Sequence, residues 1–194
     1  MASIRDVACQ QILLEDSSVF SVQWLVLPFD LADGVTPEFL LERYLNHLRR
    51  FTLTLVRPRS EPGGLGLRLV GTRLNLIEFS GPEFHQDDRR HSAVLAIRGG
   101  ILVQPDRCDR GRLELSTEEL DDGLRVELQL SDYCPLLLGS AKPSTMHRML
   151  YRFTQAAIHK VVTVRFLLRL YRELAGPHAC VRVVPAQVRK GRPT

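Results

Sequence analysis

The segment FHQDDRRH, residues 84–91, places two histidines and two aspartates within eight positions. In an extended strand, His85, Asp87 and His91 would project to one side and form a mixed nitrogen and oxygen ligand set suited to zinc or another divalent ion. The segment follows SGPE, is strongly polar and separates two apolar runs, which is typical of a solvated hairpin connection. Its consecutive arginines would also repel a cation. We therefore predict a loop rather than a metal site, and we expect no cofactor.

Three further histidines, His47, His147 and His159, lie in predicted helices that are rich in arginine. An acid-base role needs a convergent partner, which the sequence does not place, so we expect all three at the surface. The four cysteines are far apart and form no CxxC pair, which argues against a zinc ribbon and a dense disulfide scaffold. Cys108 lies in a predicted loop and would need a histidine brought to it by the fold to act as a nucleophile.

Charge is unevenly distributed along the chain. Its 194 residues include 26 Lys and Arg and 22 Asp and Glu, for a net charge of +4, but residues 145–194 hold ten basic residues and one acid, Glu173. Such asymmetry can mark a surface for nucleic acid or acidic lipid. Arginine outnumbers lysine 23 to 3, a bias also expected from a GC-rich genome, and no nucleic-acid motif or aromatic platform is present. We therefore expect a solvated basic face, with nucleic-acid binding unfavoured.

The elements that must position these residues begin with SVFSVQWLVLP, which alternates with the period of a half-buried strand. Phe20, Val22 and Trp24 share one face, which we predict to point inward, and Ser21 and Gln23 share the other. A helix of about four turns is predicted in TPEFLLERYLNHLRRF, because a threonine can cap it, proline suits its first position and leucines repeat at helical spacing.

From residue 52 to residue 133, short alternating runs are separated by glycine, proline and aspartate. The clearest pair is GRLELSTEEL and GLRVELQLSDY, joined by an Asp-Gly turn. This pattern predicts an antiparallel sheet with one dry face and one wet face. The inward positions, such as Leu113, Leu115 and Leu128, include no acid, base or nucleophile, so the pattern does not indicate a buried reaction centre.

A long helix is predicted over residues 144–175, from a serine cap to a Gly-Pro stop. On a helical wheel, one apolar stripe would face the sheet, with His159 and Thr163 opposite. The stripe includes Phe153, Ala157, Val161 and Tyr171. The CVRVV segment beyond the helix could add a short strand before a basic, mobile tail.

This element order resembles the helix-grip or START-like superfamily, also called SRPBCC. The residues that carry the resemblance are IRGGILV, GLRVELQLSDYCPLL and YRFTQAAIHKVVTVRFLLRLYREL. The resemblance covers residues 15–176 and implies an α+β fold in which a curved antiparallel sheet grips the long C-terminal helix. Residues 1–14 would then be an N-terminal extension, and residues 177–194 a basic tail.

The superfamily resemblance also implies a deep apolar cavity between sheet and helix. Different members use it for lipids, sterols, polyketides or other hydrophobic molecules, and a minority for cyclase or hydrolytic chemistry. We expect binding or transport of a hydrophobic small molecule in that cavity, rather than catalysis. The expected lining residues are Trp24, Tyr133, Phe153, Thr154, Ala157, Val161 and Tyr171.

Two alternatives from other functional classes remain. One is a polyketide cyclase-like enzyme, with Tyr133, Thr154 or Tyr171 orienting the substrate. The other is an interaction module that presents the basic last quarter to nucleic acid or acidic lipid. No apolar run approaches the ~18–20 residues of a membrane span, and the first residues lack the layout of a secretory signal. We therefore expect a soluble, cytoplasmic protein of one domain, whose oligomeric state the sequence does not specify.

Overall fold

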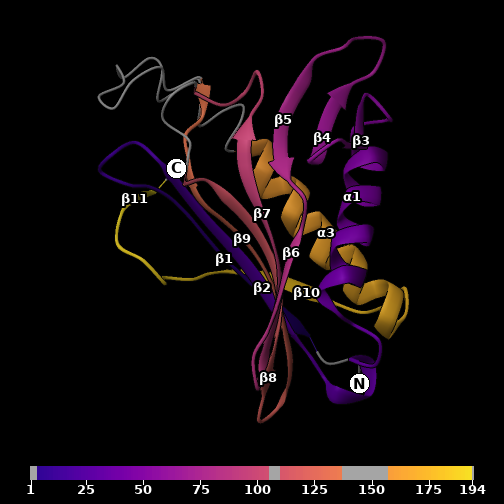
Figure 1. Cartoon of the computed structure of the whole chain (residues 1–194). Coiled ribbons are helices and arrows are strands. Elements are labelled where there is room, and N and C mark those ends of the chain that lie inside the picture. Colours follow the sequence, from indigo (N-terminus) through magenta and orange to yellow (C-terminus); the bar gives the residue numbers. More distant parts are fainter. Residues whose placement is uncertain (1–3, 105–109, 137–156, 194) are drawn as a thin grey trace.

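The computed structural model describes residues 4–104, 110–136 and 157–193, and it shows two helices lying on one side of a strongly bent sheet (Figure 1). The elements before the sheet's central hairpins are β1 (Arg5–Leu13), β2 (Val19–Leu27), η1 (Phe29–Leu31), α1 (Pro37–Phe51), β3 (Val56–Glu61), β4 (Gly64–Leu69) and β5 (Asn75–Ser80). The remaining elements are β6 (Glu83–Gln86), β7 (Arg90–Gly99), β8 (Arg112–Leu120), β9 (Gly123–Tyr133), α3 (Ala157–Ala175), β10 (Val181–Pro185) and β11 (Arg192–Pro193).

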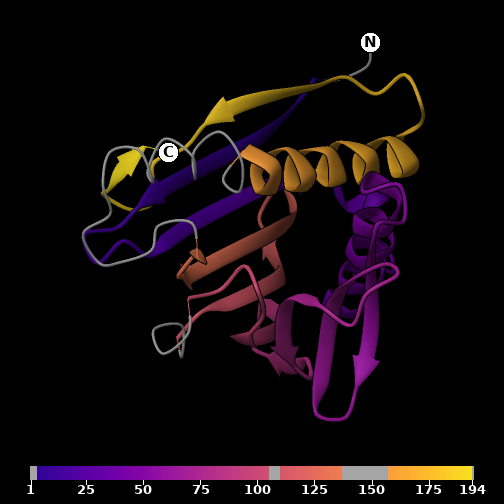
Figure 2. The same cartoon turned by 90° about the horizontal axis from the view of Figure 1, so that it is seen from above.

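Eleven strands of the described residues join in one sheet. Its order is β10-β1-β2-β9-β8-β7-β5-β4-β3, with β11 paired to β1 and β6 paired to β7. The pairing is antiparallel apart from β1 with β10, which run parallel. Figure 2 shows the sheet bending so that β1 and β2 lie on one side of the helices and β3 to β5 on the other. The predicted α+β fold with a curved sheet and a C-terminal helix is confirmed, although the sheet is mixed.

Helix α1 begins and ends as its sequence predicts. The Thr36 side chain accepts a hydrogen bond from the backbone N–H of Phe39 at 3.3 Å, and Pro37 occupies the first turn, where its missing N–H costs nothing. At the other end the Thr52 hydroxyl donates to the Leu48 carbonyl at 2.9 Å. Tyr44 and His47, on the buried face of this helix, contact Phe166 of α3.

Helix α3 is turned about its axis relative to the predicted stripe. The part of the predicted helix before Ala157 lies outside the described residues. In α3 itself Val161 is 41% exposed, whereas Thr163, predicted on the outer side, is fully buried. The prediction that Val161 faces the sheet was therefore wrong. Apolar residues occupy most of the circumference of this helix, so the helical wheel does not show which side faces the core. The residues that do enter the core are Val162, Phe166, Leu167, Leu170 and Tyr171.

Strand β2 is buried on both faces, and its side chains point opposite to the prediction. Gln23 pairs in register with Leu128 of β9, which belongs to the main core beneath the helices. Phe20, Val22 and Trp24 point to the other side of the sheet, where Phe20 and Val22 form a small second apolar cluster. The alternation was correctly recognised. Both faces of this strand are covered, however, so the more apolar face was wrongly predicted to be the one beneath the helices.

The C-terminal segment covers the second cluster. β10 lies beside β1, and the backbone N–H groups of Val188 and Arg189 donate to the Gln10 side-chain oxygen at 2.7 and 2.9 Å. The Arg189 guanidinium carbon lies 4.3 Å from the centre of the Phe20 ring. The predicted short strand is confirmed as β10, but the segment after it packs on the sheet, and β1 is a strand of the sheet where an extension was expected.

Candidate functional site

Among the described residues expected to line a ligand cavity, Trp24 and Val161 do not face the core between sheet and helix, whereas Tyr133 and Tyr171 belong to it. Trp24 lies on the outer face of the sheet, with the Arg125 guanidinium carbon 4.4 Å from its ring centre. Val161 is exposed. Tyr133 and Tyr171 are both buried, and the Tyr133 hydroxyl donates to the Leu102 carbonyl at 2.8 Å.

The other expected lining residues cannot be placed from side-chain positions. Phe153 and Thr154 lie outside the described residues, and Ala157 is described only as the first residue of α3. Cys108 and His147 also lie outside the described residues. The part of α3 that can be described against the sheet therefore begins at Ile158.

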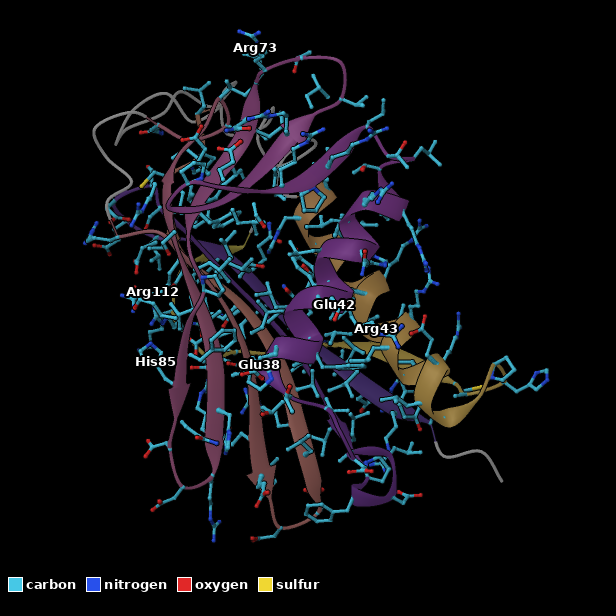
Figure 3. All side chains as sticks on the ribbon, turned by 45° about the vertical axis from the view of Figure 1, so that its right-hand side comes forward. Glu38, Glu42, Arg43, Arg73, His85 and Arg112 are labelled. Atoms are coloured by element: carbon cyan, nitrogen blue, oxygen red, sulfur yellow. The ribbon has the colours of Figure 1, made fainter. Side chains whose placement is uncertain are left out.

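The histidines of the opening segment diverge. Residues 83–86 form strand β6 rather than a loop, and only the short connection after Gln86 is a turn. His85 pairs with Ser92 and His91 pairs with Gln86, so alternation along the strands sends His85 and His91 to opposite faces. Figure 3 shows His85 on the side of the sheet away from the helices. Among the described residues, no group of three possible metal-ligating side chains converges.

A buried polar cluster lies on the inner face of β1 and β2, beneath α3. The Gln23 amide donates to the Ser21 hydroxyl at 2.8 Å and contacts the Cys9 sulfur at 3.7 Å. The Ser21 hydroxyl in turn donates to the Gln11 side-chain oxygen at 3.4 Å. Apolar residues of β9 and β8 continue the same face of the sheet, so this polar cluster lies next to the apolar core.

One atom of this cluster is left without a partner. Gln23 is 0% exposed, and its Oε1 atom makes no hydrogen bond to any described residue. Interchanging the amide oxygen and nitrogen would leave an unpartnered NH₂ group instead, so one end of the amide is unsatisfied in either assignment. Buried polar groups are almost always hydrogen-bonded, which makes this position a candidate contact for a bound molecule.

His159 adds a second unpartnered polar atom at the beginning of the described part of α3. The residue is half-buried, and its Nε2 atom is enclosed without a hydrogen-bond partner among the described residues. Burial lowers the pKa of His159 to about 4, so the ring is neutral at neutral pH. The prediction of a surface histidine was wrong here, because His159 lies one turn before the buried residues Val162 and Thr163.

Two hollows open side by side between α1 and α3, with volumes of about 290 and 680 Å³. His47, Arg50, Arg169 and Glu173 line both of them, and together we call them the α1–α3 groove. The arginines that line the groove are Arg43, Arg50, Arg165, Arg169 and Arg172. With two glutamates in its walls, the groove carries an excess of three positive charges.

His47 forms the wall that the two hollows share. It is only 9% exposed, and its ring centre lies 5.9 Å from that of Phe51 and 5.7 Å from that of Phe166. Neither ring nitrogen is in good hydrogen-bond geometry with a described residue, although the Val162 carbonyl lies close enough to act on the ring. Burial lowers its pKa, helped by the Arg169 guanidinium and opposed by the Val162 carbonyl and by Glu173. The surface position predicted for His47 was wrong, because α3 packs over the arginine-rich side of α1.

The floor of the groove is continuous with the core. The Tyr44 and Phe166 rings meet edge to face, with centres 5.3 Å apart. Burial raises the pKa of Tyr44 to about 12, while its hydrogen bond with the Thr163 hydroxyl acts in the opposite direction. These contacts hold α1 against α3 beneath the groove.

No protein-family model matches the chain, and no curated protein matches it. The solution NMR structure of CalU16 from Micromonospora echinospora is similar, with 16% sequence identity, 91% of this chain and 80% of that chain covered, and a TM-score of 0.39. The crystal structure of CalU16 is similar with 14% identity, coverage of 88% and 93%, and a TM-score of 0.33. No helix within the described residues is both long and apolar enough to span a bilayer. The chain's own strand order and helix positions define it as an α+β fold with a bent sheet holding a C-terminal helix.

Proposed function

We propose that this chain binds a hydrophobic small molecule between the inner face of β1 and β2 and helix α3, in the manner of helix-grip, START-like ligand-binding proteins. The observation that carries the proposal is the Gln23 side chain, which is fully buried and leaves one amide atom without a partner. Leaving such a group unsatisfied costs roughly 1–3 kcal/mol. A ligand that supplies the missing hydrogen bond recovers that cost.

The surroundings of Gln23 define the chemistry of the ligand. Its amide is hydrogen-bonded to Ser21 through one end, and the register continues into Leu128 and Leu115 on the neighbouring strands. An apolar body with one hydroxyl or other hydrogen-bond donor fits this setting, because the donor meets the Gln23 oxygen while the body meets leucines. His159, neutral and half-buried on α3, offers a second polar contact.

Binding is favoured over catalysis by the side chains that face the same space. The Tyr133 hydroxyl is engaged by the Leu102 carbonyl, and the inner-face cluster of β1 and β2 consists of a thiol, a hydroxyl and amides. A reaction centre needs a convergent acid, base or nucleophile with its activating partner. Gln23 and Ser21 instead form a hydrogen-bonding patch, which orients a ligand without transforming it.

The proposal is tested by native mass spectrometry of the purified chain, followed by solvent extraction of any bound molecule. We expect an additional mass on the folded protein that extraction assigns to a hydrophobic compound carrying a donor group. Gln23→Leu keeps the volume and removes the amide, so it should lose the bound molecule. Gln129→Leu, on the outer face of β9 opposite Val22, is the matched control and should retain it.

If the purified wild-type protein carries no ligand, a second experiment tests the proposal. The same variants are titrated with a hydroxylated naphthalene and with naphthalene itself, monitored by fluorescence. Preference for the hydroxylated probe that disappears in Gln23→Leu supports the proposed site. Equal binding of both probes by wild type and Gln23→Leu, or binding of neither, contradicts it.

A further inference from the structure

We propose that the α1–α3 groove is a separate binding site for an organic anion, with arginines holding the acidic group and the apolar wall holding the body of the molecule. Figure 3 shows Arg43 on α1 reaching toward α3, where its guanidinium meets Glu173 at 3.2 Å. Glu173 also accepts from Arg169 at 2.8 Å. One carboxylate thus ties together both sides of one hollow.

Three further arginines of the groove are not neutralised. Within the part of the chain that the structure describes, no carboxylate pairs with Arg50, Arg165 or Arg172. Three guanidinium groups around one hollow create a positive potential that a carboxylate or phosphate relieves by charge-assisted, often bidentate hydrogen bonds. An unpaired arginine at a surface is common, so the arginines alone do not define a site.

His47 supplies the second, independent observation. It is about nine-tenths buried and lines both hollows, and only one of its ring nitrogens has a polar neighbour, the Val162 carbonyl, among the described residues. An imidazole surrounded by Phe51 and Phe166 is a costly group to leave unsatisfied. A small displacement of Arg50 or Arg169, which line the same two hollows, would admit an anionic oxygen beside the ring, and a nearby anion favours the protonated ring, in which both nitrogens donate. The structure therefore offers a donor between the arginines rather than only a charged rim.

The apolar part of the groove selects an organic anion over an inorganic one. The larger hollow, of about 680 Å³, is walled by Phe51, Leu168 and Pro177 together with the arginine stems. The Arg165 guanidinium lies over the Phe51 ring, with its carbon 5.7 Å from the ring centre. Small-molecule sites commonly have volumes of about 300–1,000 Å³ and walls that are mainly apolar. A molecule with an acidic end and an apolar body matches both features.

The groove differs from the position proposed for the hydrophobic ligand. Leu167, on the core side of α3, is fully buried and lines neither hollow, whereas Arg165 and Arg169 of the same helix line the groove. The two sites therefore lie on different sides of α3. Variants at Gln23 and variants at the groove arginines can consequently separate them.

The test uses decanoate as the organic anion, decanol as its uncharged analogue and inorganic phosphate as an anion without a body. Binding is measured by calorimetry, and the His47 ring nitrogens are followed by NMR. In the Gln23→Leu protein, which lacks the proposed site for a hydroxylated apolar ligand, we expect decanoate to bind more tightly than decanol or phosphate and to shift the His47 ring signals. The Arg165→Gln/Arg172→Gln variant should bind decanoate about tenfold more weakly, a loss of roughly 1.4 kcal/mol.

Arg73→Gln is the matched control, because Arg73 is an exposed arginine on the turn between β4 and β5, away from the groove (Figure 3). It should bind decanoate as wild type does, and so should Gln23→Leu. The proposal is overturned if decanoate leaves the His47 signals unmoved, if the double variant binds like wild type, or if Gln23→Leu abolishes the binding. Equal affinity for phosphate and decanoate would show charge attraction alone and would also overturn it.

Discussion

At the scale of single residues, Gln23 and His47 share one property, which is a buried polar atom without a hydrogen-bond partner in the described structure. Each such atom lowers the stability of the ligand-free protein by roughly 1–3 kcal/mol. Gln23→Leu and His47→Phe should therefore raise the free energy of unfolding, measured by urea denaturation, even as they weaken binding. Gln129→Leu, at a partly exposed outer-face position, should change it by less than about 0.5 kcal/mol. Lower stability of both variants would mean that these groups are satisfied in the free protein.

The histidines also predict acid sensitivity. An unfolded histidine has a pKa of about 6.5, whereas burial lowers the pKa of His159 to about 4. On acidification the unfolded chain takes up a proton before the folded chain does, so the free energy of unfolding falls between about pH 6.5 and pH 4. His159→Gln should reduce this loss, measured by urea denaturation at about pH 7 and about pH 5. His85→Gln, on the exposed hairpin, should keep the wild-type dependence, and an unchanged slope in His159→Gln would contradict the assignment.

A third residue-scale prediction concerns the turn after α1. Leu53 has a φ of 51° and a side chain that is 82% exposed. The left-handed region costs a residue with a Cβ about 1–2 kcal/mol, and asparagine tolerates it better than leucine. Leu53→Asn should therefore raise the melting temperature by a few degrees. Leu55→Asn, at a neighbouring exposed leucine without a positive φ, should not, and equal effects would point to solubility rather than backbone conformation.

At the scale of elements, helix α3 illustrates how much a sequence pattern can determine. The apolar periodicity and the Gly-Pro stop were sufficient to predict a helix ending near Ala175, which the structure confirms. They could not determine which side of the helix faces the core, because the apolar residues Val161, Val162 and Leu168 lie on different sides of it. The sheet residues Leu115 and Leu128 were predicted inward correctly, since the neighbouring positions on their strands are polar or charged.

The rotation of α3 leads to a contrast between two substitutions. Val161→Asp should change the free energy of unfolding by less than about 1 kcal/mol, because the side chain is 41% exposed. Leu167→Ala should lower it by about 2–5 kcal/mol, because Leu167 is fully buried and the change leaves a cavity. Chemical denaturation of both variants measures the difference. A Val161→Asp protein that fails to fold would show that α3 is rotated differently.

At the scale of the whole molecule, the C-terminal segment explains why the site could be predicted only in part. The alternation in β2 was clear, but its inner face depends on which later segment covers the outer one, and Arg189 reaches Phe20 from 169 residues away. The same long-range packing brings α3 over His47. Local sequence patterns specify strands and helices. Which elements pack on which face of the sheet depends on contacts between residues that are far apart in the sequence.

Removal of residues 177–194 should test the covering role of this segment. The truncated chain loses β10 and uncovers Phe20, Val22 and the edge of β1, so it should bind an apolar dye, melt at a lower temperature and aggregate. Arg182→Gln, which removes only the exposed ion pair with Asp6, should leave the melting temperature close to that of wild type, because exposed ion pairs are screened by solvent. A truncated protein with wild-type melting and no dye binding would contradict this role.

The parallel pairing of β1 with β10 also orders events during synthesis on the ribosome. Asp6 and its partner Arg182 are 176 positions apart in the chain. At about 5–20 residues per second, the first strand emerges roughly 10–35 s before the strand that seals its edge has been made. During that interval the nascent chain exposes a row of unpaired amide and carbonyl groups to other nascent chains. The edge of β1 that β10 covers in the folded protein therefore stays open to pairing with other strands until the last residues have been made.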